Sequence, residues 1–117
     1  MDELVLIVDD DERNAKLARD VLEKAGMRTL TAATAAAGID AARAHRPDVV
    51  LMDLRLPDLD GAAAARTLAD DPVTAEIPVV ALSALQEHHV GTPFAGYVEK
   101  PIDVRAFPAQ VRRHCRR

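Results

Sequence analysis

Four short apolar runs along the chain each lead into a polar or charged side chain. The runs lie at Leu4–Val8, Val49–Met52, Val79–Leu82 and Tyr97–Val98. A continuous run of about five Val, Ile and Leu residues is typical of a strand that is buried on both faces, as the strands of parallel sheets are. The pattern therefore predicts a buried parallel sheet that contains these four segments.

Between the first two of these runs, the apolar residues recur mostly at the spacing of a helix. Apolar residues spaced three and four apart predict a helix over Arg13–Ala25 and a second helix, capped by Thr34, that runs to about Ala44. Arg28–Ala32 lies between them and alternates as an edge-side strand does. The residues expected to face inward are Leu17, Ala18, Val21, Leu22 and Ala25 in the first helix, and Ala36, Ile39 and Ala42 in the second.

Further helices follow in the second half of the chain, and two of them have clear positions. One is predicted over Ala62–Leu68, and a last helix follows Val104. Pro108 would interrupt a helix interior, so we expect this last helix to start near Phe107, with the proline in its first turn. A strand followed by a helix, repeated five times, predicts an α/β fold with a doubly wound parallel sheet and right-handed crossovers. At 117 residues the chain suits one domain over residues 1–117.

Polar residues with related chemistry stand at the predicted strand ends. They are Asp9, Asp10, Asp53, Ser83 and Lys100. Ligands of open parallel sheets bind beyond the carboxyl ends of the strands, so these side chains are expected to meet at one edge. Clustered carboxylates repel one another, and a hard cation such as Mg²⁺ removes that repulsion. The set predicts a metal and phosphoryl site in which Asp53 can attack phosphorus, and in which Ser83 and Lys100 can bind the phosphoryl oxygens.

Composition narrows the class of protein. The net charge of −4 argues against nucleic acid as the main partner. No apolar stretch approaches the ~20 residues of a membrane helix. Cys115 is the single cysteine, which fits a reducing cytosol, and the N-terminus lacks the basic start of a secretory signal. We therefore expect a cytoplasmic protein that binds neither membrane nor nucleic acid.

Taken together, the strand-end motifs resemble those of the receiver domain of two-component response regulators, over essentially the whole chain. The matching motifs are Val8-Asp9-Asp10, Leu51-Met52-Asp53-Leu54-Arg55-Leu56-Pro57, Asp60-Gly61, Ala81-Leu82-Ser83-Ala84 and Lys100-Pro101. The resemblance implies a flavodoxin-like (βα)5 fold with strand order 2-1-3-4-5. It also implies a stand-alone signalling domain that takes a phosphoryl group from a sensor histidine kinase or a histidine phosphotransfer protein, and then binds a downstream protein according to its phosphorylation state.

The same resemblance implies a role for each site residue. Asp53 would be the phosphoacceptor and Lys100 would pair with the phosphoryl group, with a cis peptide bond before Pro101. Ser83 would be the switch hydroxyl and Tyr97 the switch aromatic. The ligands of Mg²⁺ (or Mn²⁺) would be Asp10 directly, Asp9 mostly through water, Asp53, and the backbone carbonyl of Arg55.

The chain departs from the family pattern in two places. The stretch from Ser83 to Lys100 is shorter than usual, which predicts a shortened fourth helix near Leu85–His89. Such a helix would move recognition away from the usual output face, toward the first and last helices around Arg13, Asn14 and Phe107. The other departure is Arg55 itself, a long cation beside the phosphoryl site that can change the access of water or of a phosphodonor.

Two alternatives remain open from the sequence. The chain can be a degenerate receiver that binds partners without phosphorylation, although Asp53, Ser83 and Lys100 are all present. It can also be a phosphohydrolase that works through an aspartyl phosphate. Dehalogenase-type phosphatases place a second Asp two residues after the nucleophile, and here that position is Arg55.

Overall fold

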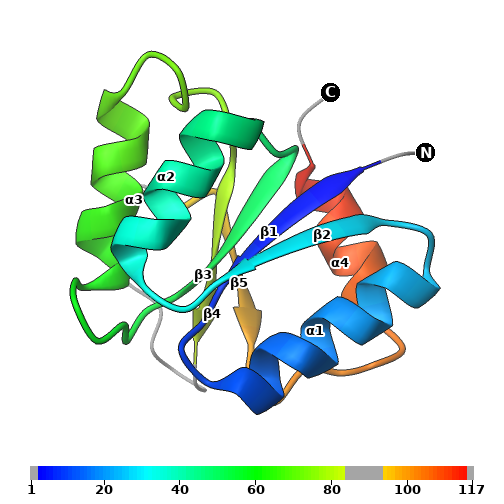
Figure 1. Cartoon of the computed structure of the whole chain (residues 1–117). Coiled ribbons are helices and arrows are strands. Elements are labelled where there is room, and N and C mark those ends of the chain that lie inside the picture. The colour runs from blue at the N-terminus through cyan, green and yellow to red at the C-terminus, as the bar shows by residue number, and fades with distance from the viewer. Residues whose placement is uncertain (1–2, 84–93, 116–117) are drawn as a thin grey trace.

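The computed structural model describes residues 3–83 and 94–115, and Figure 1 shows the arrangement of their elements. The strands are β1 (Leu4–Val8), β2 (Arg28–Ala32), β3 (Val49–Asp53), β4 (Val79–Ser83) and β5 (Gly96–Glu99). The helices are α1 (Glu12–Lys24), α2 (Ala35–His45), α3 (Gly61–Asp70) and α4 (Phe107–His114). The predicted elements in these ranges are confirmed, with their ends shifted by a few residues.

The five strands form one parallel sheet in the order β2-β1-β3-β4-β5, which confirms the expected topology. β3 is the central strand, where Leu51 pairs with Ile7 of β1 on one side and with Val80 of β4 on the other. Helices α1 and α4 lie on one face of the sheet, and α2 and α3 lie on the other (Figure 1). The result is a three-layer α/β fold.

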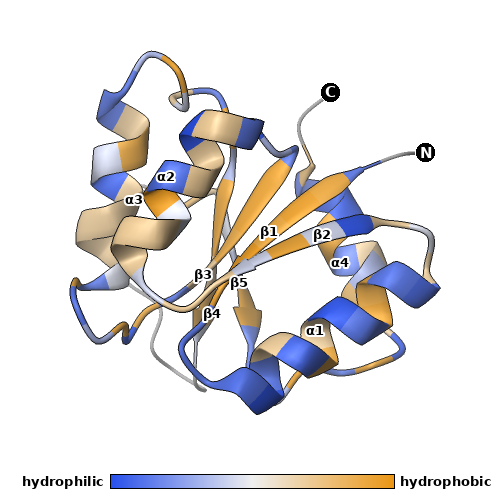
Figure 2. Cartoon of the chain, in the orientation of Figure 1, coloured by the Kyte–Doolittle hydropathy of each residue, from blue (hydrophilic) through white to orange (hydrophobic). Residues whose placement is uncertain are grey.

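Side chains that alternate along each strand build two separate cores. Val5 and Ile7 of β1 face α1 and α4, and pack in the cluster that holds Leu22 and Phe107. Leu6 and Val8 face α2 and α3, in the cluster with Met52, Ala64 and Leu68. Figure 2 shows hydrophobic residues along the strands and many hydrophilic ones on α1, while the alanine-rich α2 and α3 are more weakly hydrophobic. Burial on both faces explains why the sequence of the inner strands is continuously apolar.

Most residues predicted to face inward from the first two helices are buried or packed against a core, and Leu17 and Ala36 are the exceptions. In α1, Ala18 and Leu22 are buried, but Leu17 is 41% exposed. In α2 the buried residues are Ala35, Gly38 and Ala42, and Ala36 is exposed. The apolar side chains of both helices outnumber the positions that touch the sheet. The apolar pattern alone therefore predicted both helices correctly but assigned Leu17 and Ala36, at the margins of the buried faces, to the inside.

The last helix starts at Phe107 and carries Pro108 in its first turn, as expected. The prediction that Phe107 contributes to a partner surface is wrong, because the side chain is fully buried. It packs with Val111 of the same helix against the strands of the sheet. An aromatic ring at the start of a short helix is here an anchor for the core.

The predicted shortened helix at Leu85–His89 lies outside the described residues. The label α4 therefore belongs to the last helix of the chain, not to that segment. Among the described ranges, no helix has the length and apolar character that a membrane crossing requires.

Gly38 permits the close approach of α2 to β1. A Cβ atom at this position would lie 2.7 Å from Cγ2 and 3.0 Å from Cγ1 of Val8, a buried β-branched residue that cannot rotate away. We predict that Gly38→Ala lowers the free energy of unfolding by about 1–3 kcal/mol, because overpacking outweighs the gain in helix propensity. Urea unfolding followed by circular dichroism measures this change.

The Gly38→Ala, Val8→Ala double variant separates the two effects. Removing the Val8 methyl groups makes room for the added Cβ, so the double variant should lose less stability than the sum of the two single variants. Strict additivity would show that the contact does not limit the approach of the helix.

Candidate metal and phosphoryl site

The carboxyl ends of the strands bring the predicted acids together. Asp9 follows β1 directly and Asp53 is the last residue of β3, which pairs with β1. Carboxylate oxygens of Asp9, Asp10 and Asp53 all lie within 4.8 Å of one another. Such a group of oxygen donors can hold one cation between them.

Asp9 is the most buried acid of the cluster, with 3% of its surface exposed. Its Oδ1 accepts a hydrogen bond of 2.9 Å from the backbone N–H of Asp11. Its buried Oδ2 accepts no hydrogen bond within the described part of the chain and lies 3.5 Å from Nζ of Lys100. Burial raises the pKa of the Asp9 carboxyl above its ordinary value, and the hydrogen bond from Asp11 and the charge of Lys100 offset only part of that effect.

Lys100 bridges two of the acids. Its Nζ lies 3.3 Å from Oδ1 of Asp53 as well as 3.5 Å from Asp9. The same Asp53 oxygen accepts a hydrogen bond of 3.2 Å from the backbone N–H of Arg55. Lys100 itself is held beside β4, because its backbone N–H donates to the carbonyl of Ser83 at 2.7 Å. The peptide bond between Lys100 and Pro101 is cis, as expected.

These residues fit a divalent cation. Three carboxylates face one ammonium group, so negative charge remains in excess at this edge of the sheet. The buried Asp9 oxygen without a hydrogen bond is an acceptor available to a ligand. Hard oxygen donors of this kind are the ligands that Mg²⁺ prefers.

Ser83 places a hydroxyl at the next strand end. The residue is 1% exposed, and its Oγ has no hydrogen-bond partner among the described residues. A buried hydroxyl without a hydrogen-bond partner is unfavourable unless a ligand or a water molecule forms the missing bond. Ser83 pairs across the sheet with Glu99, next to Lys100 in the chain, so it belongs to the same edge.

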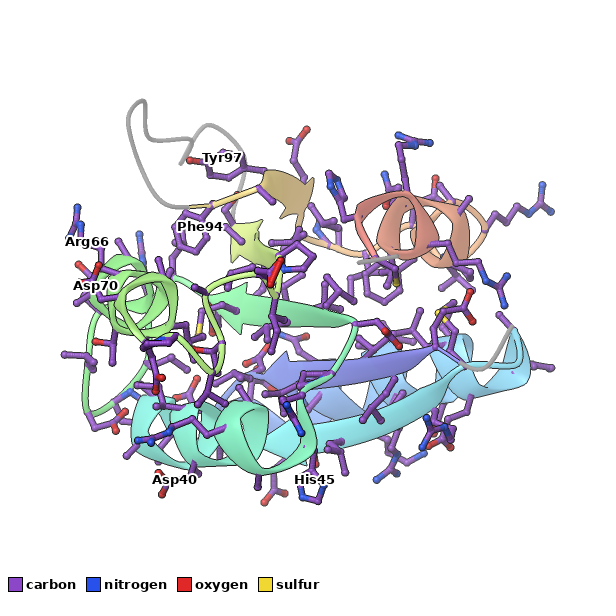
Figure 3. The ribbon with its side chains drawn as sticks, turned by 90° about the horizontal axis from the view of Figure 1, so that it is seen from above. Asp40, His45, Arg66, Asp70, Phe94 and Tyr97 are labelled. Atoms are coloured by element: carbon purple, nitrogen blue, oxygen red, sulfur yellow. The ribbon has the colours of Figure 1, made fainter. Side chains whose placement is uncertain are left out.

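Tyr97 lies further from this edge than the other predicted residues. It pairs with Ala81 of β4, two positions before Ser83. The half-buried ring packs edge-on against Phe94, with the ring centroids 5.8 Å apart and the planes at 60°. Figure 3 shows the two rings together beside β5. The structure does not bring Tyr97 into the acidic cluster.

The loop between β3 and α3 carries Arg55. Arg55 forms an isolated antiparallel bridge with Asp60, and the N–H of Gly61 donates to the carbonyl of Leu54 at 3.1 Å. A Cβ atom on Gly61 would lie within 2.4 Å of the Asp53 carbonyl oxygen, so this approach requires glycine. The base of the loop is thereby closed beside Asp53.

Asp58, near the tip of this loop, has a role that the sequence analysis missed. Its two carboxylate oxygens accept hydrogen bonds from the N–H groups of Ala35 at 2.8 Å and Ala36 at 3.0 Å, at the start of α2. These bonds lower the pKa of the exposed Asp58 carboxyl. No local pattern could have revealed them, because the partners are more than twenty residues apart in the chain.

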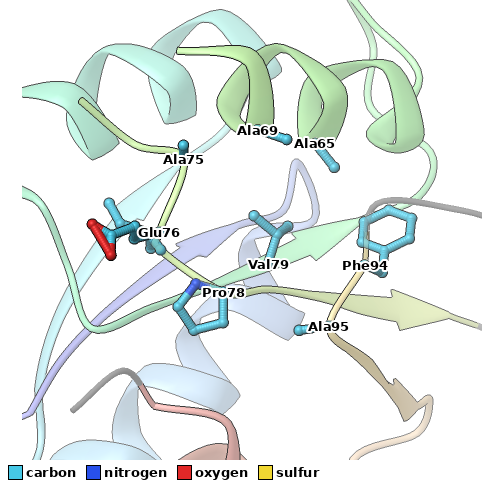
Figure 4. Close-up of a pocket in the computed structure, with 9 residues that line it drawn as sticks. Ala65, Ala69, Ala75, Glu76, Pro78, Val79, Phe94 and Ala95 are labelled. Atoms are coloured by element: carbon cyan, nitrogen blue, oxygen red, sulfur yellow. The ribbon is translucent and has the colours of Figure 1, made fainter. Parts of the chain in front are cut away.

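A separate cavity of about 290 Å³ lies at the other end of β4. Figure 4 shows it between α3 and the residues that precede β5. Its walls are mostly apolar and include Ala65, Val79 and Phe94. Since Val79 starts β4 and Ser83 ends it, this cavity is distinct from the acidic site.

The carboxyl ends of the central strands thus carry an acidic cluster that can hold a cation, with Lys100 and Ser83 beside it. The family model of the response regulator receiver domain matches residues 5–112, and the chain belongs to this family. The polar-differentiation response regulator DivK of Brucella anthropi is 38% identical over 112 residues, which cover 92% of this chain and 91% of that protein.

Solved receiver structures have the same fold. The receiver domain of the sensor histidine kinase PA1611 from Pseudomonas aeruginosa, which has a magnesium ion coordinated in its active-site cleft, matches with a TM-score of 0.88 and 28% identity over 97% of this chain and 98% of that one. The chemotaxis response regulator CheY4 of Vibrio cholerae matches with a TM-score of 0.87 and 22% identity, over 97% and 98% of the two chains. At that identity CheY4 supports the fold alone.

The burial of Asp9 predicts an effect on stability that depends on pH. We expect Asp9→Asn to raise the melting temperature in metal-free buffer at neutral pH, because it removes a charge that burial disfavours. With a raised pKa, the folded protein holds this proton more tightly than the unfolded chain. That stabilisation is complete below the ordinary pKa of about 3.9 and is lost as the pH rises through the raised value.

Calorimetry at several pH values, with excess chelator, measures the effect. The difference between the variant and the original protein should shrink toward acid pH, where Asp9 is neutral. Asp40→Asn, an exposed substitution on α2 (Figure 3), is the matched control and should change little. A lower melting temperature for Asp9→Asn at neutral pH would contradict this interpretation of the site.

Proposed function

We propose that Asp53 is the phosphoacceptor of this receiver domain and that the domain extends over residues 1–117. The observation that carries the proposal is the position of Asp53 between Lys100, 3.3 Å away, and the cluster with Asp9 and Asp10. We further propose Asp9, Asp10, Asp53 and the backbone carbonyl of Arg55 as the ligands of Mg²⁺, with Mn²⁺ as a substitute. The magnesium ion in the related PA1611 receiver supports this choice of metal.

In the proposed reaction, a carboxylate oxygen of Asp53 attacks the phosphorus of a phosphohistidine. The new O–P bond forms as the P–N bond breaks, and the electron pair of that bond stays on the imidazole. Lys100 pairs with the transferred phosphoryl oxygens, and the Ser83 hydroxyl donates to one of them. When bound, the divalent cation neutralises charge on the carboxylates and on the phosphoryl group.

We propose that Ser83 and Tyr97 convert phosphorylation into a change of surface. The Ser83 hydroxyl is buried without a partner among the described residues, so a phosphoryl oxygen would satisfy it. A shift of Ser83 toward the phosphoryl group would leave space near the end of β4, which the Tyr97 ring can fill by leaving Phe94. A two-state packing change of this kind alters the affinity for a partner.

The partner that supplies the phosphoryl group is proposed to be a sensor histidine kinase or a histidine phosphotransfer protein. The proposed contact surface centres on α1, where Arg13 and Leu17 are exposed and Asn14 is half-buried. α1 starts two residues after Asp10, so this surface adjoins the acidic site. Phosphorylation-dependent binding of a downstream protein in the cytoplasm completes the proposal.

The two alternatives have less support. A degenerate receiver would not need Lys100 within reach of both Asp9 and Asp53, yet the ammonium group lies within 3.5 Å of each. A phosphohydrolase of the dehalogenase type would need an acid where Arg55 stands. An arginine stays protonated at neutral pH and cannot act there as a general base.

Phosphorylation with a small phosphodonor tests the assignment of Asp53. We expect acetyl phosphate with Mg²⁺ to add one phosphoryl group to the protein, as measured by intact-protein mass spectrometry. Chelation of the metal should prevent the reaction, because the carboxylates would then repel the donor. Asp53→Asn should lose all stable incorporation, while the control Asp40→Asn should react like the original protein. Stable incorporation into Asp53→Asn would refute the assignment.

The proposed switch requires the hydroxyl of Ser83. We expect Ser83→Ala to accept a phosphoryl group on Asp53 while the amide NMR signals of Tyr97 and Val98 no longer shift on phosphorylation. Ser83→Thr retains the hydroxyl and should preserve those shifts. Equal shifts in the Ser83→Ala and original proteins would show that the hydroxyl does not couple the site to β5.

A further inference from the structure

The loop between β3 and α3 is attached to the rest of the protein in two ways. At its base, bonds within the segment from Leu54 to Gly61 close the loop on itself. At its tip, Asp58 binds the N–H groups of Ala35 and Ala36. These two hydrogen bonds join the loop to a helix that does not adjoin it in the chain.

The start of α2 is built to receive this carboxylate. The first N–H groups of a helix lack partners within the helix and carry the positive end of its dipole. Thr34 accepts from the third of them, on Ala37, at 3.1 Å, and Asp58 accepts from the first two. One cap is therefore local to the helix, and the other comes from the loop that carries Arg55.

We propose that Asp58 is a positioning residue for the metal site, which it serves by fixing the loop that presents the backbone carbonyl of Arg55. This inference rests on the proposed function, in which that carbonyl is a ligand of Mg²⁺. Arg55 lies three residues before Asp58, and the bridge between Arg55 and Asp60 encloses Asp58 in the same short loop. A tip held on α2 restricts the directions in which the Arg55 carbonyl can point.

The packing of Leu56 supports the same arrangement. Leu56 is partly buried against the core cluster that contains Ala35 and Val8. The loop thus packs through Leu56 on the face of the sheet that α2 and α3 cover, and Asp58 binds α2 through two charge-assisted hydrogen bonds. Asp58 supplies the directional part of this attachment, because hydrogen bonds fix orientation and an apolar contact does not.

A pair of variants distinguishes positioning from ordinary helix capping. Asp58→Ala and Thr34→Ala each remove a cap from α2, so both should lower the melting temperature. Only Asp58→Ala releases the loop. We expect it to raise the dissociation constant for Mg²⁺ by about tenfold, the lower end of the effect of residues that orient metal ligands. Thr34→Ala should leave that constant unchanged.

Titration calorimetry with magnesium chloride measures the constant, and circular dichroism confirms that each variant is folded. Asp58→Asn keeps one oxygen acceptor and should give an intermediate affinity. Equal affinities of Asp58→Ala and the original protein, or an equal loss in Thr34→Ala, would overturn the inference. If the original protein itself bound no Mg²⁺, the proposed function would fail first, and the inference with it.

Amide exchange in the original protein provides a test that needs no variant. Coupling between two sites is reciprocal, so Mg²⁺ that binds the Arg55 carbonyl should in turn strengthen the attachment of Asp58 to α2. The exchange of the Ala35 and Ala36 amides should then slow on addition of Mg²⁺, as measured by NMR. Unchanged exchange at both amides, with saturating metal, would overturn the inference even if Asp58→Ala does not fold.

Discussion

Three carboxylates lie close together at the carboxyl ends of buried strands and repel one another. The other features of the site follow from that repulsion. Two unit charges about 4 Å apart interact by roughly 4 kcal/mol at an effective dielectric of 20. Lys100 offsets part of this by contacting both Asp9 and Asp53. The remaining negative charge favours the binding of a divalent cation, which in the proposed function also neutralises the phosphoryl group.

The fold maintains this unfavourable cluster because its apolar core determines where the strands end. β1 and β3 are buried on both faces, and their register places Asp9 and Asp53 at neighbouring strand ends. Gly61 brings the start of α3 against the Asp53 carbonyl, which leaves the connecting loop little freedom. The two core clusters thus stabilise the fold, so the acidic residues at the strand ends can be used for binding.

Much of this arrangement could be predicted from the sequence, because its signals are local. The continuous runs that lead to Asp53 and Ser83 identified both the strands and the acidic edge. The errors arose where tertiary contacts decide the outcome. Leu17 and Ala36 have the spacing of buried residues but lie at the margins of their helices, and Phe107 anchors the core. The hydrogen bonds that the loop residue Asp58 forms with α2 could not be predicted, because its partners there are distant in the chain. The predicted shortened helix falls outside the described residues.

Chemical mapping of the phosphoryl group tests the central claim most directly. Borohydride reduces an aspartyl phosphate to homoserine, and peptide sequencing by mass spectrometry then locates the modified residue. After phosphorylation in the presence of Mg²⁺, we predict homoserine at position 53 and at no other aspartate. Homoserine at Asp9 or Asp10, or a phosphoryl group found only on a histidine, would contradict the account of the site.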